Sequence, residues 1–443
     1  MNRIGVLIAL LVAACAPPVR MPPEAVQRHR QDILALAADG KTKEAWEQYV
    51  ELINTSGVAQ YPAVLLQLAT RVLERGFAAP GVEVREQAVR ALQYCDHEFA
   101  FTAAAGRLED EDTTVRAAAV DVLRKLGRPA AAKLIRPQLK PPAPEDKEFL
   151  LTEGLRALES LQMHAMWALA ELGEKSLPVA PAVKGMTGPD PHIRAVGARA
   201  LGAMGNPEAL PSLRYGLDED IEWEVNSASA EALLKLGRRG IVESFAGRVS
   251  RSDYPEKVVW SINMRRSHAL GPTVDWIWRE ATYNASAEVR MRAAVCLGEM
   301  EVHDAAPRLI EMTEHLEPLV KAAAAYALAM LRDRSKIGII VEATGSRDPE
   351  ARARAVEYLT ALDGERYLGI FRSLEEDPDP RVRLAAVLAF RPGGGLPPQM
   401  AFQYLAWPLG DENDEVRFTA AALIRKARHA GIAPPAEPVR TGN

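Results

Sequence analysis

One pattern of residues returns along most of this chain, and it constrains the fold more than any other feature. An acidic residue precedes a valine-arginine pair, and small and apolar residues then follow at helical spacing up to a leucine-glycine end. Successive copies are mostly about 31 to 34 residues apart, so we predict an array of repeats. Clear copies begin at Val84, Val115, Ile193, Val289, Val320, Ala351, Val382 and Val416, and weaker copies begin at Leu161, Val225 and Val259.

Each copy carries the start and stop signals of a helix. Aspartates stand at predicted N-caps, and the proline that follows each suits the first helical position, where no amide hydrogen bond is lost. These aspartates include Asp190, Asp348 and Asp379. After Val115 the apolar residues recur at intervals of three and four, which places them on one helix face. Four helices are predicted to end at a glycine in the C′ position, namely Gly127, Gly173, Gly205 and Gly237.

A two-helix unit of this length cannot bury its own apolar face, so neighbouring units must stack around one continuous core. The pattern, with its Asp-Pro-x-Val-Arg start, resembles HEAT repeats, especially the short bacterial HEAT-like kind, over roughly residues 80 to 430. We therefore expect an all-α protein, an α-solenoid that forms a right-handed superhelix of about 11 units. The resemblance implies that the second helix of each unit lines the concave side. It also implies that the arginine after the valine binds acids of its own or the neighbouring repeat.

Departures from the pattern divide the chain into segments. Three helices without the pattern, predicted at 23–38, 42–54 and 62–75, look like a terminal cap for the solenoid. The predicted segments are a signal peptide at 1–14, a lipidated cysteine with a proline-rich tether at 15–23, the helical cap at 24–79, the solenoid at 80–430, and a disordered tail at 431–443. A proline-rich insertion at 137–144 and a glycine- and proline-rich joint at 391–398 interrupt the solenoid.

The first residues have the pattern of an export signal. Arg3 gives a positive start, and the apolar run from Ile4 to Val12 is too short to span a bilayer but suits a signal peptide. Val12-Ala13-Ala14-Cys15 resembles the lipobox of bacterial lipoproteins, which implies cleavage before Cys15 and attachment of lipid to it. Among such lipoproteins, Ala16 in place of aspartate favours the outer membrane. We expect an outer-membrane lipoprotein that faces the periplasm, with an inner-membrane lipoprotein or a secreted protein as alternatives.

The recurring arginines allow two interpretations. They could form a row that binds anions, or a structural ladder of ion pairs that holds the repeats in register. Most follow an acid by three or four residues, which favours the ladder. The seven are Arg85, Arg116, Arg194, Arg290, Arg352, Arg383 and Arg417.

A tryptophan-rich segment interrupts the pattern between Tyr254 and Tyr283. Trp260 occupies the ladder position, and polar residues such as Asn263 and Arg266 fall where other copies place core residues. One interpretation is a partner surface, because Trp, Tyr and Arg dominate interface hot spots. The other is an irregular repeat packed by tryptophan. The candidate protein-binding residues are Tyr254, Trp260, Arg265, Arg266, His268, Trp276, Trp278 and Tyr283.

The sequence lacks the usual motifs of catalysis and metal binding. It contains no Cys-x-x-Cys, His-Glu-x-x-His or Gly-x-Ser-x-Gly. Deoxyhypusine hydroxylase, a HEAT-like iron enzyme, uses several His-Glu pairs, whereas this chain has only His97-Glu98. Cys95 and Cys296 are expected to be small buried residues rather than a disulfide.

Charge and motifs together favour binding of protein over chemistry or nucleic acid. The net charge is −5, and a nucleic-acid binder would need a basic face. We expect no catalytic residue, no metal and no cofactor. The predicted function is a membrane-anchored, periplasm-facing scaffold for protein partners of unknown identity. The alternative is an enzyme of the HEAT-like lyase type that acts on a tetrapyrrole or another small molecule.

Overall fold

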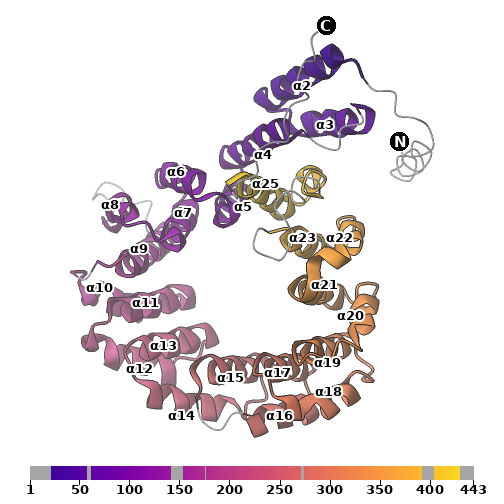
Figure 1. Cartoon of the computed structure of the whole chain (residues 1–443). Helices are drawn as coiled ribbons and strands as arrows, with labels where there is room; N and C mark the ends of the chain where they lie inside the picture. The colour runs from indigo at the N-terminus through magenta and orange to yellow at the C-terminus, as the bar shows by residue number, and fades with distance from the viewer. Residues whose placement is uncertain are drawn as a thin grey trace. The chain divides into compact units, whose positions relative to one another are not determined.

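The computed structural model describes residues 21–56, 61–140, 153–174, 176–270, 274–391 and 404–429. Over these residues the protein consists of α-helices and short 3-10 helices (η), with no strand (Figure 1). The prediction of an all-α solenoid is confirmed. The predicted signal peptide, Cys15, most of the tether and the tail lie outside the described residues, as do half of the insertion at 137–144 and most of the joint at 391–398.

The chain forms two compact units. Unit 1 combines Met1–His97 with Phe371–Asn443, and unit 2 consists of Glu98–Ile370. The chain therefore begins in unit 1, forms the whole of unit 2, and ends in unit 1.

Unit 2 is a stack of two-helix repeats. In its first half α7, α9, α11 and α13 pack side by side, and in its second half α15, α17, α19 and α21 do the same. Its helices are α6 (His97–Arg107), α7 (Thr113–Leu126), α8 (Ala130–Ile135), α9 (Glu153–Glu171), α10 (Val179–Gly185), α11 (Pro191–Met204), α12 (Leu210–Asp218), α13 (Trp223–Lys235), α14 (Arg239–Val249), α15 (Pro255–His268), α16 (Val274–Tyr283), α17 (Ala287–Glu299), α18 (Ala306–Met312), α19 (Pro318–Met330), α20 (Ile337–Ala343) and α21 (Pro349–Asp363). The 3-10 helices are η2 (Arg136–Leu139), η4 (Pro207–Ala209), η5 (His303–Ala305) and η6 (Gly364–Tyr367).

Two apolar clusters lie in the interior of unit 2, and both include residues of α15. One cluster runs from Met163 to Leu270 and includes Met264 of α15. The other runs from Val258 to Leu331 and includes Ile262 of the same helix. The helix in the tryptophan-rich segment therefore contributes to both clusters.

The predicted helix ends are formed by local hydrogen bonds and backbone geometry. The carboxylates of Asp190, Asp348 and Asp379 accept hydrogen bonds from the backbone N–H two residues later, as N-caps do. The four glycines predicted at C′ positions all have positive φ angles, between 64° at Gly127 and 94° at Gly173. Sequence alone therefore places these ends correctly.

Unit 1 joins segments that are far apart in the sequence. Its helices are α2 (Pro23–Ala38), α3 (Thr42–Ser56), α4 (Pro62–Phe77), α5 (Val82–Ala91), η1 (Leu92–Tyr94), α22 (Leu368–Leu374), α23 (Pro380–Ala389), η7 (Pro408–Gly410) and α25 (Asp414–His429). The last helix, α25, packs against α4, α5 and η1 (Figure 1). The helices expected to cap the solenoid thus also contact its final repeat.

Several contacts hold the two parts of unit 1 together. The indole Nε1 of Trp46 donates a hydrogen bond of 2.8 Å to the carbonyl oxygen of Ala406. The guanidinium of Arg425 lies 3.2 Å from a carboxylate oxygen of Asp96 and also donates to the hydroxyl of Thr70. Helix α4 approaches α25 so closely at Gly76 that an added Cβ would lie 2.6 Å from the ring of Phe418.

Candidate functional site

The seven recurring arginines share one backbone contact. In each, Nη1 of the guanidinium donates to the carbonyl oxygens six and five residues earlier, in the loop that precedes its helix. For Arg194 these acceptors are Gly188 and Pro189, both at 3.0 Å. Loop carbonyls need hydrogen-bond partners, and the positive guanidinium is a strong one. The geometry fits a structural role for these arginines better than an anion-binding row.

Ion pairs link three of these arginines to the following repeat. Arg194 binds Asp220 at 2.7 Å, and Arg290 binds Glu317 at 2.6 Å. Arg383 binds Asp411 at 2.8 Å. The aspartates four residues before Arg194 and Arg383 instead cap their own helices. Counting acids upstream of each arginine therefore points to the wrong partner for these two residues.

The tryptophan-rich segment packs largely into the interior of unit 2. Trp260 is half-buried, and its ring centroid lies 5.5 Å from that of Trp223 and 5.6 Å from that of Phe245, in both cases edge to face. Trp276 and Trp278 pack against the cluster around Ile277. These contacts support the interpretation of an irregular repeat packed by tryptophan.

The polar residues that the repeat pattern places in the core of this segment, Asn263 and Arg266, do not lie there. The buried residues of α15 are Val258, Ser261, Ile262 and Met264, so the buried stripe begins one residue earlier than the repeat register predicts. As a result Arg266 is exposed and pairs with Glu299 at 3.0 Å, while Asn263 binds Arg292 at 2.5 Å. The expectation that polar side chains occupy core positions here was wrong.

The other candidates in this segment divide by exposure. Tyr254 and Tyr283 are 61% and 79% exposed, and His268 is also exposed. Arg265 lies over the ring of Trp276, 5.0 Å from its centroid, and donates to the carbonyl oxygen of Leu270. Among the candidates, Tyr254, Arg266, His268 and Tyr283 are therefore the exposed ones.

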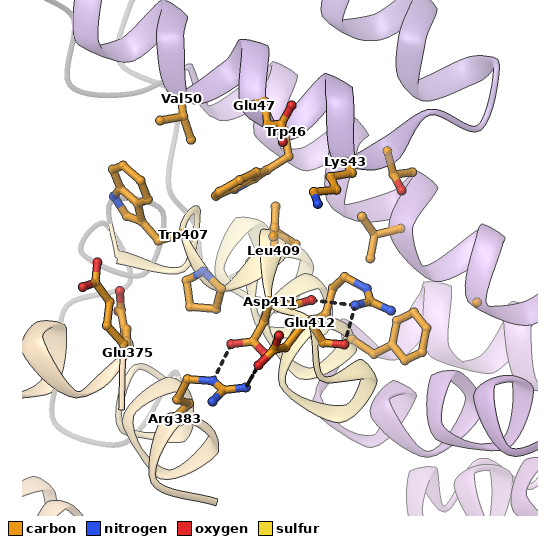
Figure 2. A pocket seen from close by; sticks show the side chains of 18 of the residues that line it. Lys43, Trp46, Glu47, Val50, Glu375, Arg383, Trp407, Leu409, Asp411 and Glu412 are labelled. Carbon is orange, nitrogen blue, oxygen red and sulfur yellow. Dashed lines mark hydrogen bonds and ion pairs between the residues drawn. The ribbon is translucent and has the colours of Figure 1, made fainter. Parts of the chain in front are cut away.

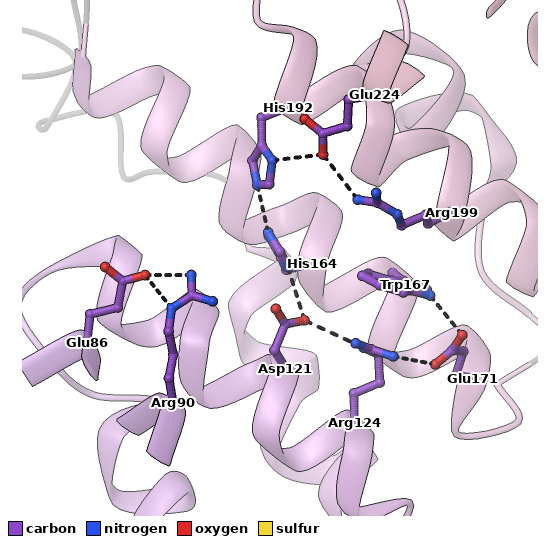
Figure 3. A network of polar contacts seen from close by, with 10 residues as sticks. All are labelled: Glu86, Arg90, Asp121, Arg124, His164, Trp167, Glu171, His192, Arg199 and Glu224. Atoms are coloured by element: carbon purple, nitrogen blue, oxygen red, sulfur yellow. Dashed lines mark hydrogen bonds and ion pairs between the residues drawn. The ribbon is translucent and has the colours of Figure 1, made fainter. Parts of the chain in front are cut away.

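A network of polar contacts links α7, α9, α11 and α13, which pack side by side in unit 2 (Figure 3). Asp121 of α7 lies 3.2 Å from Nδ1 of His164 on α9, and Nε2 of His164 lies 3.4 Å from Nε2 of His192 on α11. His192 in turn lies 3.4 Å from Glu224 of α13. Glu224 also pairs with Arg199 at 3.4 Å. Each link joins neighbouring repeats.

Trp167 lies at the centre of a second part of this network. Its Nε1 donates to Glu171 at 2.9 Å, and Glu171 also binds Arg124 at 2.7 Å and Lys235 at 3.1 Å. The guanidinium of Arg124 lies 3.7 Å from the centroid of the Trp167 ring, and that of Arg199 lies 5.7 Å from it. The tryptophan ring is thus half-buried between two cations.

Two acids of this network, Glu171 and Asp121, have lowered pKa values. Burial by itself raises the pKa of Glu171, but the hydrogen bonds from Arg124, Lys235 and Trp167 hold it below its ordinary value. The pKa of Asp121 is also lowered, because the hydrogen bond from His164 and the electrostatic interactions with His164, Arg124 and Lys125 together outweigh burial. The surface therefore carries fixed charges of both signs around one aromatic ring.

Unit 1 contains a pocket of about 1140 Å³ between its N-terminal and C-terminal parts (Figure 2). One wall is formed by α3 and α4, including Lys43, Trp46 and Glu47. The opposite wall is formed by the residues after α22, by α23 and by the start of α25, with Trp407 and η7 between the walls. Charged groups of both signs and two tryptophans line it.

A buried carboxyl oxygen without a partner lies in this pocket. Oε1 of Glu375 is shielded from solvent and has no hydrogen-bond partner. Burial raises the pKa of Glu375 well above its ordinary value, although the nearby Arg372 acts in the opposite direction. The rings of Trp46 and Trp407 meet edge to face, with their centroids 6.2 Å apart and their planes at 78°.

The repeats match a known family. A family model of HEAT repeats matches residues 71–148, 150–234 and 277–360, which is more than half of the chain. The chain belongs to the HEAT-repeat family. A comparison with curated proteins finds no match.

Several solved structures have a similar HEAT-like fold at low sequence identity. The protein Kap95p, solved with RanGDP, is 14% identical with a TM-score of 0.35, and the match covers 83% of this chain and 55% of Kap95p. Human deoxyhypusine hydroxylase is 19% identical with a TM-score of 0.27, over 66% of this chain and 95% of that one. The CpcE and CpcF complex of phycocyanin lyase from Nostoc sp. PCC7120 is 20% identical with a TM-score of 0.24, over 64% of this chain and 94% of that one.

Within the HEAT-repeat array, the cysteines are buried as expected. Cys95 and Cys296 are free, and burial raises the pKa of both thiols, that of Cys296 to about 11. Over the part of the chain that the structure describes, no group of three or more His, Cys, Asp or Glu side chains is placed to hold a metal ion. In that same part, no helix is long and apolar enough to cross a membrane.

Sequence reasoning missed both the network and the pocket. Repeat copies place His164, Trp167 and His192 on neighbouring helices, so their proximity could have been found by aligning the copies. No such signal exists for Trp46 and Trp407, because they lie in parts of the chain that meet only after folding.

Proposed function

We propose that this HEAT-repeat chain is a membrane-anchored, periplasm-facing scaffold that binds protein partners on the face formed by α7, α9, α11 and α13. The observation that carries this proposal is the polar network around Trp167. In the proposal the chain performs no reaction of its own and needs no cofactor.

The chemistry of this face suits a protein partner. Trp and Arg are the residue types most enriched at interface hot spots, and here the Trp167 ring lies between Arg124 and Arg199. The ion pairs of Glu171 already hold the charged side chains in place, so a partner would lose little side-chain entropy there on binding. Charges of both signs favour a partner with complementary charges.

The anchoring part of the proposal is supported by the N-terminal sequence. A cysteine after a short apolar run has the features of a lipidation site, and bacterial lipoproteins carry several acyl chains. Two or more chains are needed for stable attachment to a membrane. We therefore expect Cys15→Ala to release the protein from the membrane fraction. Unchanged membrane fractionation of this variant, with no acyl mass on the wild-type protein, would contradict the anchor.

The binding surface can be tested by purifying the native protein with its partners. Trp167→Ala should weaken retention of a stoichiometric partner by about 2 kcal/mol, or roughly thirtyfold, if Trp167 is a hot spot. Trp276→Ala is a matched control, because Trp276 is also half-buried with an arginine over its ring but belongs to the segment 254–283. Melting temperatures measured on both variants separate loss of binding from loss of folding.

The result also decides between the two candidate surfaces. If the partner is retained by Trp167→Ala but lost by a Tyr254→Ala and Tyr283→Ala double variant, the surface lies at the exposed ends of the segment 254–283. Co-purification of a small molecule, with no protein at stoichiometric amount, would refute the scaffold.

A further inference from the structure

The pocket of unit 1 is lined by a carboxyl group, that of Glu375, in which one buried oxygen has no hydrogen-bond partner. Glu375 follows α22 directly, and its backbone N–H continues the helical hydrogen bonds to Phe371 and Arg372. Its backbone is therefore held by the end of a helix. A buried polar atom without a hydrogen bond costs free energy, so proteins rarely leave one unless a ligand or another group completes it.

The other acids of the pocket differ from Glu375 in having partners or solvent. Asp411 binds Arg383 at 2.8 Å, and Asp377 accepts the backbone N–H of Asp379 at 2.9 Å. Glu412 is largely exposed. Glu375 is therefore the pocket carboxyl with a buried oxygen left without a bond.

Two tryptophan rings line the same pocket as this carboxyl group. Figure 2 places Glu375 and Trp407 on the same side of the pocket, with Trp46 and Glu47 on the α3 side. The Trp46 ring is fixed, because its Nε1 is bonded to Ala406 and its ring lies against Gly410. Indole rings attract cations, and elsewhere in this chain Arg124 and Arg265 lie over tryptophan rings at 3.7 and 5.0 Å.

We propose that this pocket binds an organic cation, an ammonium or guanidinium group, between the carboxyl group of Glu375 and the ring of Trp407. The cation would bond to the carboxyl group of Glu375 and stabilise its ionised form in a buried setting. A volume of about 1140 Å³ can hold a ligand of several residues. The group could come from a free polyamine or from a lysine or arginine side chain of a peptide. This site is separate from the Trp167 face and does not depend on it.

Titration calorimetry on the full chain tests the proposal with three probes. These are spermidine, an acetylated and amidated Gly-Ala-Lys-Ala-Gly peptide, and the same peptide with norleucine in place of lysine. We expect at least one cationic probe to bind and the norleucine peptide to bind at least tenfold more weakly. Binding of spermidine alone assigns the site to small amines, and binding of the lysine peptide alone assigns it to a protein side chain.

Variants tie the binding to Glu375. Glu375→Gln keeps the size of the side chain and removes its negative charge, so it should weaken binding of the cationic probe at least tenfold. Trp407→Leu should weaken it severalfold through loss of the ring. Glu365→Gln makes the same chemical change at an exposed position outside the pocket and should bind as the wild type does. Equal affinity for lysine and norleucine peptides, no binding of either cationic probe, or undiminished binding by Glu375→Gln with a normal melting temperature would overturn the proposal.

Discussion

Replacing Gly76 with alanine tests whether α25 packs tightly against α4. Gly76 lies one residue before the end of α4, and an added Cβ would lie 2.6 Å from Cε1 and Cζ of Phe418 and 2.7 Å from Cβ of Ala88. Distances this short force side chains or helices to move. The Ala88 methyl group is fixed to its own helix and cannot rotate away, so the helices themselves must shift.

The expected magnitude follows from two opposing effects. Glycine to alanine in a helix by itself stabilises by up to ~1 kcal/mol. Overpacking a filled interior typically costs ~1 to 3 kcal/mol. Because two separate neighbours are approached too closely, we expect overpacking to dominate and Gly76→Ala to lower the free energy of unfolding by about 1 to 2 kcal/mol.

A matched control separates the two effects. Gly106 also lies one residue before the end of its helix, α6, but an added Cβ there would meet nothing within 4 Å. Gly106→Ala should therefore be neutral or stabilising, and the two variants should differ by about 2 kcal/mol in urea unfolding. Hydrogen exchange of Gly76→Ala should show reduced protection in α4, α5 and α25. Adding Phe418→Leu to this variant should restore part of the lost stability. Equal stability of the Gly76 and Gly106 variants would refute the close packing of α4 and α25.

Two further predictions concern the ladder and the tryptophan-rich segment. Burial raises the pKa of Asp220, but the hydrogen bonds from Arg194 and from the backbone N–H of Glu222, together with the charge of Arg194, lower it overall. The pair therefore stabilises the fold above the unfolded pKa of about 3.9, and the gain is lost as pH falls through the lower folded pKa. Hydrogen-exchange protection around residue 220 should fall below about pH 4 in the wild type, whereas Asp220→Asn should lack this pH step. Trp260→Ala should lower the free energy of unfolding by about 3 kcal/mol, because it opens the cluster with Trp223 and Phe245. Tyr254→Ala, at an exposed site in the same segment, should change the free energy of unfolding by no more than about 0.5 kcal/mol. Equal losses of stability for the two variants would contradict the packing role of Trp260.

Local signals allowed most helix ends to be predicted. A cap such as Asp190 and a stop such as Gly205 act through hydrogen bonds and dihedral angles within a few residues, so the sequence nearby determines them. The partner of Arg194 could not be found in this way. Asp220 lies 26 residues later and is brought close only by the stacking of repeats.

The candidate sites were harder to predict than the fold. Trp260 and Trp276 are of the residue types that form hot spots, but the same large rings also fill interiors, and composition does not distinguish the two. Nothing in the sequence around Glu375 indicates that it belongs to a binding site. Its importance depends on a pocket wall made by Trp46, which lies more than three hundred residues away in the chain.

Unit 1 combines helices from both ends of the chain, and this affects how it can fold during synthesis. Thr70 of α4 precedes its partner Arg425 of α25 by 355 residues. At about 5 to 20 residues per second, a ribosome needs roughly 20 to 70 seconds to make the chain between them. During that time α4 can pack against α5, but the surface at Gly76 that receives Phe418 stays uncovered. The helices made first must therefore wait for the last one, and an apolar surface is left open to chaperones or to aggregation until α25 arrives.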